Sequence, residues 1–172
     1  GKDTRRSSYM FECALAAGIT ASGADACLMH VTTTPSVSYI SKVDEFDCGI
    51  MISASHNPYY DNGIKLINRH GEKVIDKIEA YLDSKENLPY ATGADIGRVI
   101  DYASGRNRYI GYLISLATHS YKDMKVALDC ANGSAWMIAE NVFQALGAET
   151  HVINNKPDGI NINERCGSTH IE

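Results

Sequence analysis

The chain has 172 residues, of which 44% are hydrophobic and 22% are charged, and its formal net charge is −5 at pH 7. These values are typical of a globular protein with one large domain or two small ones. The negative charge gives no reason to expect nucleic acid or an acidic membrane surface as a partner. No apolar run approaches the ~20 residues that span a bilayer.

The five cysteines are spread along the chain and form no Cys-x-x-Cys pair. An odd number cannot make a complete disulfide framework, and a cysteine in an apolar segment behaves as a small hydrophobic residue. We therefore expect a reducing compartment, the cytoplasm. The six histidines show no ligand-type spacing, which argues against a zinc site.

Both ends of the sequence are abrupt. The chain starts with GKDTRRS, which has no initiator Met and reads as the loop after a strand, and it stops at CGSTHIE. No signal peptide is visible at the start. We expect a piece of a longer protein, cut at both ends.

The first part of the chain alternates helices and strands. Ser7 or Ser8 can cap a first helix, which Gly23 would end. Thr34 is the expected cap of a second helix with Pro35 at its first position, running to about residue 43. Short apolar runs predict strands at residues 26–31 and 48–52. Alternation of this kind favours a parallel α/β sheet.

The rest of the chain continues the pattern. Further strands are expected at residues 64–68, 125–128 and 149–153, and further helices at residues 75–82, 103–118 and 135–146. The predicted fold class is α/β, with a mixed, mainly parallel sheet between helices and a partial second α/β domain. Polar residues gather after Asp83, so we place a first domain at 1–88, a linker at 89–102 and a second domain at 103–172.

The segment ISASHNPYYDNGIK, residues 52–65, follows directly on an apolar strand. Ligands bind beyond the carboxyl ends of strands in open α/β sheets, and a serine placed there acts as a nucleophile or a phosphate acceptor. Hydrolysis is poorly supported because Ser55 lacks the Gly-x-Ser-x-Gly pattern. Phosphoryl transfer is better supported, since His56 and Lys65 can donate hydrogen bonds to the moving group. The spacing alone does not separate Ser53 from Ser55.

The same segment resembles the catalytic loop of the α-D-phosphohexomutases. GKDTR at residues 1–5 is similar to a segment of the first domain of that family. ALDCANGSA (127–135), PDGININ (157–163) and CGSTH (166–170) resemble the second domain of its phosphoglucosamine mutase branch. These matches follow the order of the family over nearly the whole chain.

This resemblance implies that Ser55 carries the phosphoryl group and that His56 and Lys65 assist proton transfer and hold the phosphate. Asn57 and Arg5 are predicted substrate-binding residues, and Arg5 has two further interpretations, an ion pair with Asp3 or an orienting donor for the loop. The substrate would be a phosphorylated amino sugar, glucosamine 6-phosphate, converted to glucosamine 1-phosphate through a bisphosphorylated sugar. Mg²⁺ would bridge the phosphoserine and an Asp-rich loop.

The sequence departs from the family pattern in ways that affect activity. The Asp-x-Asp-x-Asp loop, the amino-terminal strand and two further domains are absent from these 172 residues, and Ser8 replaces a common glycine. The resemblance therefore implies an active parent enzyme, with a homodimer as one expected state of the parent, and an inactive fragment. Two alternatives remain open, a phosphomannomutase or phosphoglucomutase, and a non-catalytic phosphosugar-binding or assembly module.

Three further interpretations concern packing. The segment 129–134 is expected to contact the other domain rather than to bind an anion. The polar segment 154–170 is expected to pack between the domains. The tyrosines of the helix at 103–118 are expected in the core and in domain contacts rather than on a stacking surface.

Overall fold

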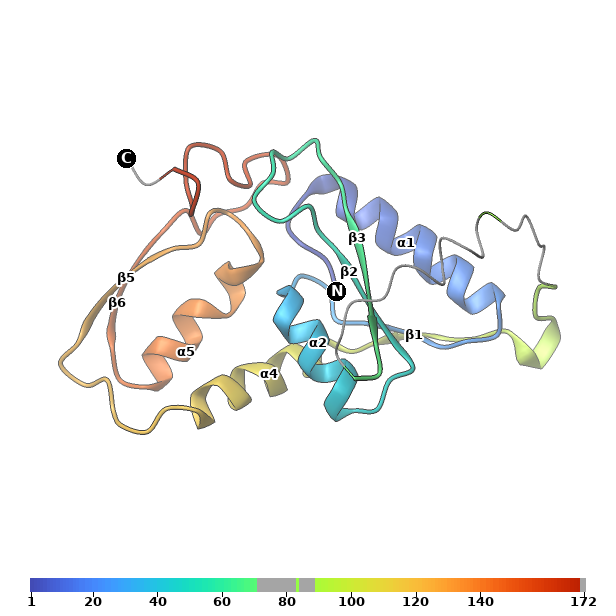
Figure 1. The fold of residues 1–172 in the computed structure, drawn as a ribbon, viewed down its shortest axis with the longest axis horizontal. Helices are drawn as coiled ribbons and strands as arrows, with labels where there is room; N and C mark the ends of the chain where they lie inside the picture. Colours follow the sequence, from blue (N-terminus) through green and yellow to red (C-terminus); the bar gives the residue numbers. More distant parts are fainter. Residues whose placement is uncertain (71–82, 84–88, 171–172) are drawn as a thin grey trace.

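The computed structural model describes residues 1–70, 83 and 89–170 (Figure 1). The helix predicted at residues 75–82 lies outside these residues. The helices are α1 (Arg6–Ala21), α2 (Thr34–Val43), α4 (Ala103–Ser115) and α5 (Ala139–Ala145), with 3₁₀ turns η1 (Gly93–Asp95) and η2 (Ser134–Met137). The strands are β1 (Ala26–Leu28), β2 (Cys48–Ile52), β3 (Ile64–Asn68), β4 (Val99–Asp101), β5 (Lys125–Asp129) and β6 (Glu149–Ile153).

The first unit consists of residues 1–70 together with β4, and it contains both parallel and antiparallel strand pairs. β1 pairs with β4 in parallel, and β2 pairs with β3 in antiparallel. Lys2 forms parallel bridges to both Val31 and Ile52, so the first residues of the chain lie between the β1 and β2 segments. The amide of Lys2 donates to the His30 carbonyl, and the amide of Asp3 donates to the Ile52 carbonyl, each at 3.0 Å. The GKDTR segment is therefore hydrogen-bonded to the end of β2, the strand that precedes the loop containing Ser55.

The second unit, residues 125–170, starts with a parallel pair. β5 and β6 pair in parallel, and the chain between them forms η2 and α5. Parallel neighbours need such a crossover connection. Gly147 follows α5 with a φ of +95°, a conformation that glycine adopts without steric cost and that commonly ends a helix. The predicted α/β class is confirmed in both units.

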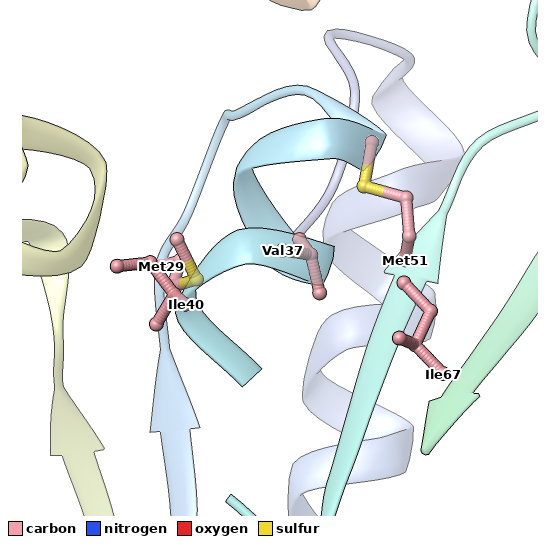
Figure 2. Packing of buried hydrophobic residues seen from close by; sticks show 5 residues of the cluster. All are labelled: Met29, Val37, Ile40, Met51 and Ile67. Carbon is pink, nitrogen blue, oxygen red and sulfur yellow. The ribbon is translucent and has the colours of Figure 1, made fainter. Parts of the chain in front are cut away.

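The core of the first unit lies where α2 packs against its strands. Met29, Val37, Ile40, Met51 and Ile67 form one buried cluster, which Figure 2 shows around α2, with β1 on one side and β2 and β3 on the other. Gly49 allows this approach, because a Cβ there would lie 2.2 Å from the Ser41 hydroxyl oxygen. The cluster fixes β2 and therefore the point at which the next loop leaves the sheet.

Two predicted helix caps are wrong. α1 begins at Arg6 with Arg5 as its N-cap, and the Ser8 hydroxyl donates instead to the buried Asp3 carboxylate at 2.6 Å. Ser8 lies inside the first turn of α1 and therefore cannot be its N-cap, and the Asp3 carboxylate is a strong charged acceptor for its hydroxyl proton. α2 begins one residue early, with Thr33 as its N-cap, and neither cap makes a side-chain hydrogen bond to the helix.

Helix α4 joins the two units. It packs against α2 of the first unit and α5 of the second. Tyr112 stacks on Tyr39 with ring centroids 4.1 Å apart, and Tyr109 is buried beside them. The predicted core position is confirmed for Tyr109, whereas Tyr112 contacts Tyr39 of the first unit but stays exposed. The predicted linker contains β4, which pairs with β1, so this segment is part of the first unit's sheet. No helix among the described residues is long and apolar enough to cross a membrane.

Candidate active site at the loop after strand β2

The loop of residues 53–63 connects the antiparallel strands β2 and β3. Its two ends are tied together, because the Ser53 amide donates to the Gly63 carbonyl at 2.8 Å. A Cβ at Gly63 would lie 2.8 Å from the Ser53 carbonyl oxygen, closer than real Cβ contacts come. Gly63 therefore closes the base of the loop in a way that a larger residue would disturb.

The two serines of this loop have different environments. Ser53 is buried, whereas Ser55 is exposed. The Ser53 hydroxyl accepts a hydrogen bond of 3.0 Å from the Ser55 amide. Ser55 has a φ of +58°, in the left-handed region that costs a non-glycine residue free energy unless its surroundings fix it. The loop thus presents the Ser55 side chain to solvent on a constrained backbone.

Arg5 supplies the main constraint from the amino-terminal segment. Its side chain is buried, with 1% exposed, and its guanidinium forms an ion pair with Asp3. Nη2 of the same side chain lies 2.6 Å from the Asn57 carbonyl oxygen, with the Ser55 and Pro58 carbonyl oxygens at 3.4 and 3.3 Å. Arg5 therefore forms the predicted ion pair and also the predicted orienting contacts. Its predicted substrate contact stays a prediction.

Asp3 holds the guanidinium in place from the other side. One of its carboxylate oxygens accepts hydrogen bonds from the Arg5 amide at 3.0 Å and from the Ser8 hydroxyl. A buried carboxylate needs hydrogen-bonding partners, and Arg5 and Ser8 supply them to Asp3. Asp3, Arg5 and Ser8 thus form a local hydrogen-bond network that supports the loop.

Asn163, from the far end of the chain, makes the second set of contacts to the loop. Its side-chain amide donates to the Ser55 carbonyl at 3.0 Å and to the Asn57 carbonyl at 2.9 Å. Figure 1 shows this red segment lying beside the loop between β2 and β3. The predicted packing of residues 154–170 between the units is confirmed here. Sequence reasoning did not select Asn163, although the PDGININ motif that contains it was noted.

The remaining predicted site residues occupy the loop and its return strand. His56 is exposed. The Asn57 side-chain amide donates to the Asp61 carboxylate at 3.0 Å, which braces the turn after Pro58. Lys65 pairs with Met51 in the β2–β3 register, so the chain doubles back after Asn62-Gly63 as the sequence predicts. All of them belong to the same hairpin as Ser55.

The segment 129–134 contacts the first unit, as predicted. The Thr4 hydroxyl donates to the Asn132 carbonyl at 2.6 Å, across 128 residues of sequence. The Arg6 amide donates to the Gly159 carbonyl at 2.9 Å, and the Asn163 amide donates to the Ala131 carbonyl at the same distance. The first two bonds fix the second unit against the start of α1, and the third holds residue 163 to segment 129–134 within the second unit.

Asp129 stabilises the segment that carries Asn163. Its carboxylate accepts hydrogen bonds from the amides of Ala131 and Gly167, at 2.9 and 2.7 Å, and from the Asn154 side chain at 2.9 Å. Partial burial tends to raise the pKa of Asp129, but these three donors outweigh it and hold the pKa below its usual range. The Asp129 carboxylate is therefore ionised at neutral pH and accepts all three hydrogen bonds in that form.

The described residues do not assemble a metal site from side chains alone. No group of three or more His, Cys, Asp or Glu side chains within residues 1–70, 83 and 89–170 is arranged to hold a metal ion. The predicted contact of Mg²⁺ with a phosphate on Ser55 stays a prediction.

Comparison with known proteins identifies the family. Residues 1–88 match the family model for phosphoglucomutase/phosphomannomutase, alpha/beta/alpha domain I. The chain is 66% identical over 177 aligned residues to a phosphoglucosamine mutase of Lachnospira eligens and 62% identical to one of Lachnoclostridium phytofermentans. All of the chain is aligned in both cases, and it spans 39% and 40% of those proteins.

Solved structures agree with this match. A phosphoglucomutase/phosphomannomutase family protein from Burkholderia thailandensis superposes with a TM-score of 0.73 at 25% identity, over 92% of this chain and 35% of that one. An N-acetylphosphoglucosamine mutase from Aspergillus fumigatus, at 17% identity and a TM-score of 0.52, shares the fold over 93% of this chain and 42% of its own. Together with the family model, which covers more than half of the sequence, these findings show that the chain belongs to the phosphoglucomutase/phosphomannomutase family.

Proposed function

We propose that the full-length protein containing this chain is a phosphoglucosamine mutase that interconverts glucosamine 6-phosphate and glucosamine 1-phosphate. The names and high identity of the curated relatives support this substrate. The observation that carries the mechanism is Ser55, an exposed hydroxyl on a loop whose backbone is held by Arg5 and Asn163. Phosphoryl transfer depends mainly on such positioning and on charge stabilisation.

The proposed reaction has two transfers that balance each other. In the first, the bond between phosphorus and the Ser55 oxygen breaks while a bond to the sugar O1 forms, and the O1 hydroxyl gives up its proton. The bisphosphorylated sugar then turns over in the site. In the second, the bond from phosphorus to O6 breaks, the Ser55 oxygen is phosphorylated again, and O6 receives a proton. The product is glucosamine 1-phosphate.

Each predicted residue has a place in this scheme. His56 and Lys65 would move the proton and hold the phosphoryl group, in keeping with their place in the hairpin that carries Ser55. Asn57 would contact the substrate from the same loop. Arg5 would hold the loop in position by hydrogen bonds to the carbonyl oxygens of Ser55, Asn57 and Pro58, in addition to any contact with the substrate.

Magnesium is part of the proposal on chemical grounds. A phosphoserine carries about −1.5 to −2 charge at neutral pH, and it must approach a substrate that is itself a phosphate. The ion would lower this repulsion while bound at the Ser55 phosphate. Its other ligands would come from parts of the full-length protein beyond these 172 residues. The cytoplasm is the proposed location, and the five free cysteines fit a reducing compartment.

The test compares Ser55→Ala with the unchanged full-length protein on the 6-phosphates of glucosamine, mannose and glucose. The proposal predicts that glucosamine 6-phosphate has the highest kcat/KM and that Ser55→Ala loses at least about a thousandfold, since the nucleophile itself is gone. A preference for mannose or glucose 6-phosphate would favour a phosphomannomutase or phosphoglucomutase. Full turnover by Ser55→Ala would reject the mechanism, and binding without turnover by the unchanged protein would favour a non-catalytic module. The 172 residues alone are expected to be inactive.

A further inference from the structure

The side chain of Asn163 bonds to the same two carbonyl oxygens as Arg5, those of Ser55 and Asn57. Arg5 belongs to the first unit and Asn163 to the second. From this shared contact we propose that Asn163 is a positioning residue for phosphoryl transfer: it fixes the orientation of the Ser55 side chain and makes that orientation depend on the second unit. This inference rests on the proposed function of Ser55.

The contact acts on the part of Ser55 that sets its side-chain direction. Ser55 has a φ of +58°, and its amide and carbonyl are both occupied, by the Ser53 hydroxyl and by the Arg5 and Asn163 donors. Left-handed backbone at a non-glycine residue persists only where neighbours determine it. With Asn163 removed, the one donor left to the Ser55 carbonyl among the described residues is Arg5 at 3.4 Å, so the peptide after Ser55 is less constrained.

Asn163 is itself anchored in the second unit. Its amide donates to the Ala131 carbonyl at 2.9 Å, and the following turn is fixed by the bond from the Gly167 amide to Asp129. Asn163 has a φ of +59°, a conformation that asparagine tolerates better than most residues. A shift of the second unit would therefore move the amide that holds Ser55.

The proposed reaction requires that the Ser55 side chain be held in a defined orientation. Ser55 must meet two different sugar oxygens in line, once as phosphoryl donor and once as acceptor. A misplacement of about 1 Å can cost roughly a hundredfold in rate, even when it originates away from the reacting atoms. An inter-unit hydrogen bond that orients the serine is thus expected to affect the transfer step more than the binding of the sugar.

The experiment uses the full-length protein with two substitutions at this position. Asn163→Asp keeps the shape and the tolerance for left-handed backbone but replaces the donor with a carboxylate. Asn163→Gly keeps the backbone conformation and removes the side chain. Asn155→Asp is the matched control, because it makes the same charge change in the same segment, and the Asn155 side chain makes no hydrogen bond within the described residues.

The measurement is a single-turnover assay. Each protein is phosphorylated with glucose 1,6-bisphosphate, the occupancy of Ser55 is determined by mass spectrometry, and transfer to glucosamine 6-phosphate is followed by rapid quench. We expect both Asn163 variants to lose about ten- to a hundredfold in the transfer rate per phosphorylated molecule, with KM within about threefold and the control unchanged. Melting temperatures measured in parallel report any general loss of structure.

The outcomes separate this inference from the function on which it rests. Normal transfer per phosphorylated molecule in both variants would overturn the positioning role, whether or not the melting temperature falls. A loss that Asn155→Asp shares would overturn it as well, since the effect would then belong to the segment's charge. An unchanged protein that turns over without phosphate on Ser55 would overturn both the proposed function and this inference.

Discussion

The amide of Ser55 donates a 3.0 Å hydrogen bond to the hydroxyl of Ser53, which is buried at the end of β2. The sequence alone does not distinguish the two serines, but the structure places Ser53 in a buried environment and Ser55 in an exposed one. Ser53 uses its oxygen inside the fold, and Ser55 keeps its side chain at the surface. This relationship supports Ser55 as the proposed carrier of the phosphoryl group and gives Ser53 a supporting role.

The first prediction follows from that difference. Ser53→Ala removes the acceptor of the Ser55 amide and should destabilise the loop by about 1 kcal/mol, with a moderate fall in kcat. Phosphate should still be found on residue 55 when peptides of this variant are mapped by mass spectrometry. A Ser53→Ala protein that no longer takes up phosphate, beside a Ser55→Ala protein that does, would reverse the assignment.

The second prediction concerns Arg5. Arg5→Met keeps much of the side-chain volume but leaves Asp3 buried without its ion-pair partner and removes the donor to the loop carbonyls. Breaking a buried pair from one side costs about 3–5 kcal/mol, which should appear in the free energy of unfolding in urea. Arg69→Met is the control, since Arg69 pairs with Asp47 at 3.2 Å on the surface and should cost almost nothing. Equal effects of the two changes would contradict the role given to Arg5.

The third prediction tests the base of the loop. Gly63→Ala would place a Cβ 2.8 Å from the Ser53 carbonyl oxygen, so the loop must shift. Overpacking of this kind costs about 1–3 kcal/mol, and the shift should lower kcat as well. Gly111→Ala, in α4 with open space around its Cα, should instead stabilise the helix by about 0.5–1 kcal/mol. Thermal unfolding of both variants checks the signs, and a neutral Gly63→Ala would show that the loop adapts freely.

The fourth prediction is a dependence on pH. The pKa of Asp129 is held below its usual range because three hydrogen-bond donors outweigh the opposing effect of partial burial. Its contribution to stability is therefore complete above the unfolded pKa of about 3.9 and is lost as pH falls through the lower folded pKa. Urea midpoints between about pH 5 and pH 2 should fall less steeply in Asp129→Asn than in the unchanged chain.

The control for this prediction is Asp123→Asn. It removes an exposed carboxylate whose side chain makes no hydrogen bond within the described residues. The acid slope of this variant should match that of the unchanged chain. If Asp129→Asn leaves the dependence of the urea midpoint on pH unchanged, the three hydrogen bonds to this carboxylate do not contribute to stability as proposed.

Local signals in the sequence were enough for the elements that position the loop. β2 and β3 have the predicted bounds, because an apolar run and the Asn62-Gly63 turn define both strands. The caps of α1 and α2 were predicted wrongly, because each helix already includes the predicted cap residue and neither start is marked by a side-chain hydrogen bond. The bond from Asn163 to Ser55 joins residues 108 positions apart, and its partner is a backbone carbonyl, which carries no sequence signal.

The central claim is that Ser55 carries the phosphoryl group between the two sugar positions. The most direct measurement is to map phosphate on the full-length protein by peptide mass spectrometry, before and after a single turnover with excess glucosamine 6-phosphate. We expect one phosphoryl group on Ser55 at the start, its transfer to the sugar on mixing, and the return of a phosphoryl group to Ser55 as glucosamine 1-phosphate forms. Phosphate on another residue, or product formed at full rate while Ser55 stays unphosphorylated, would contradict it.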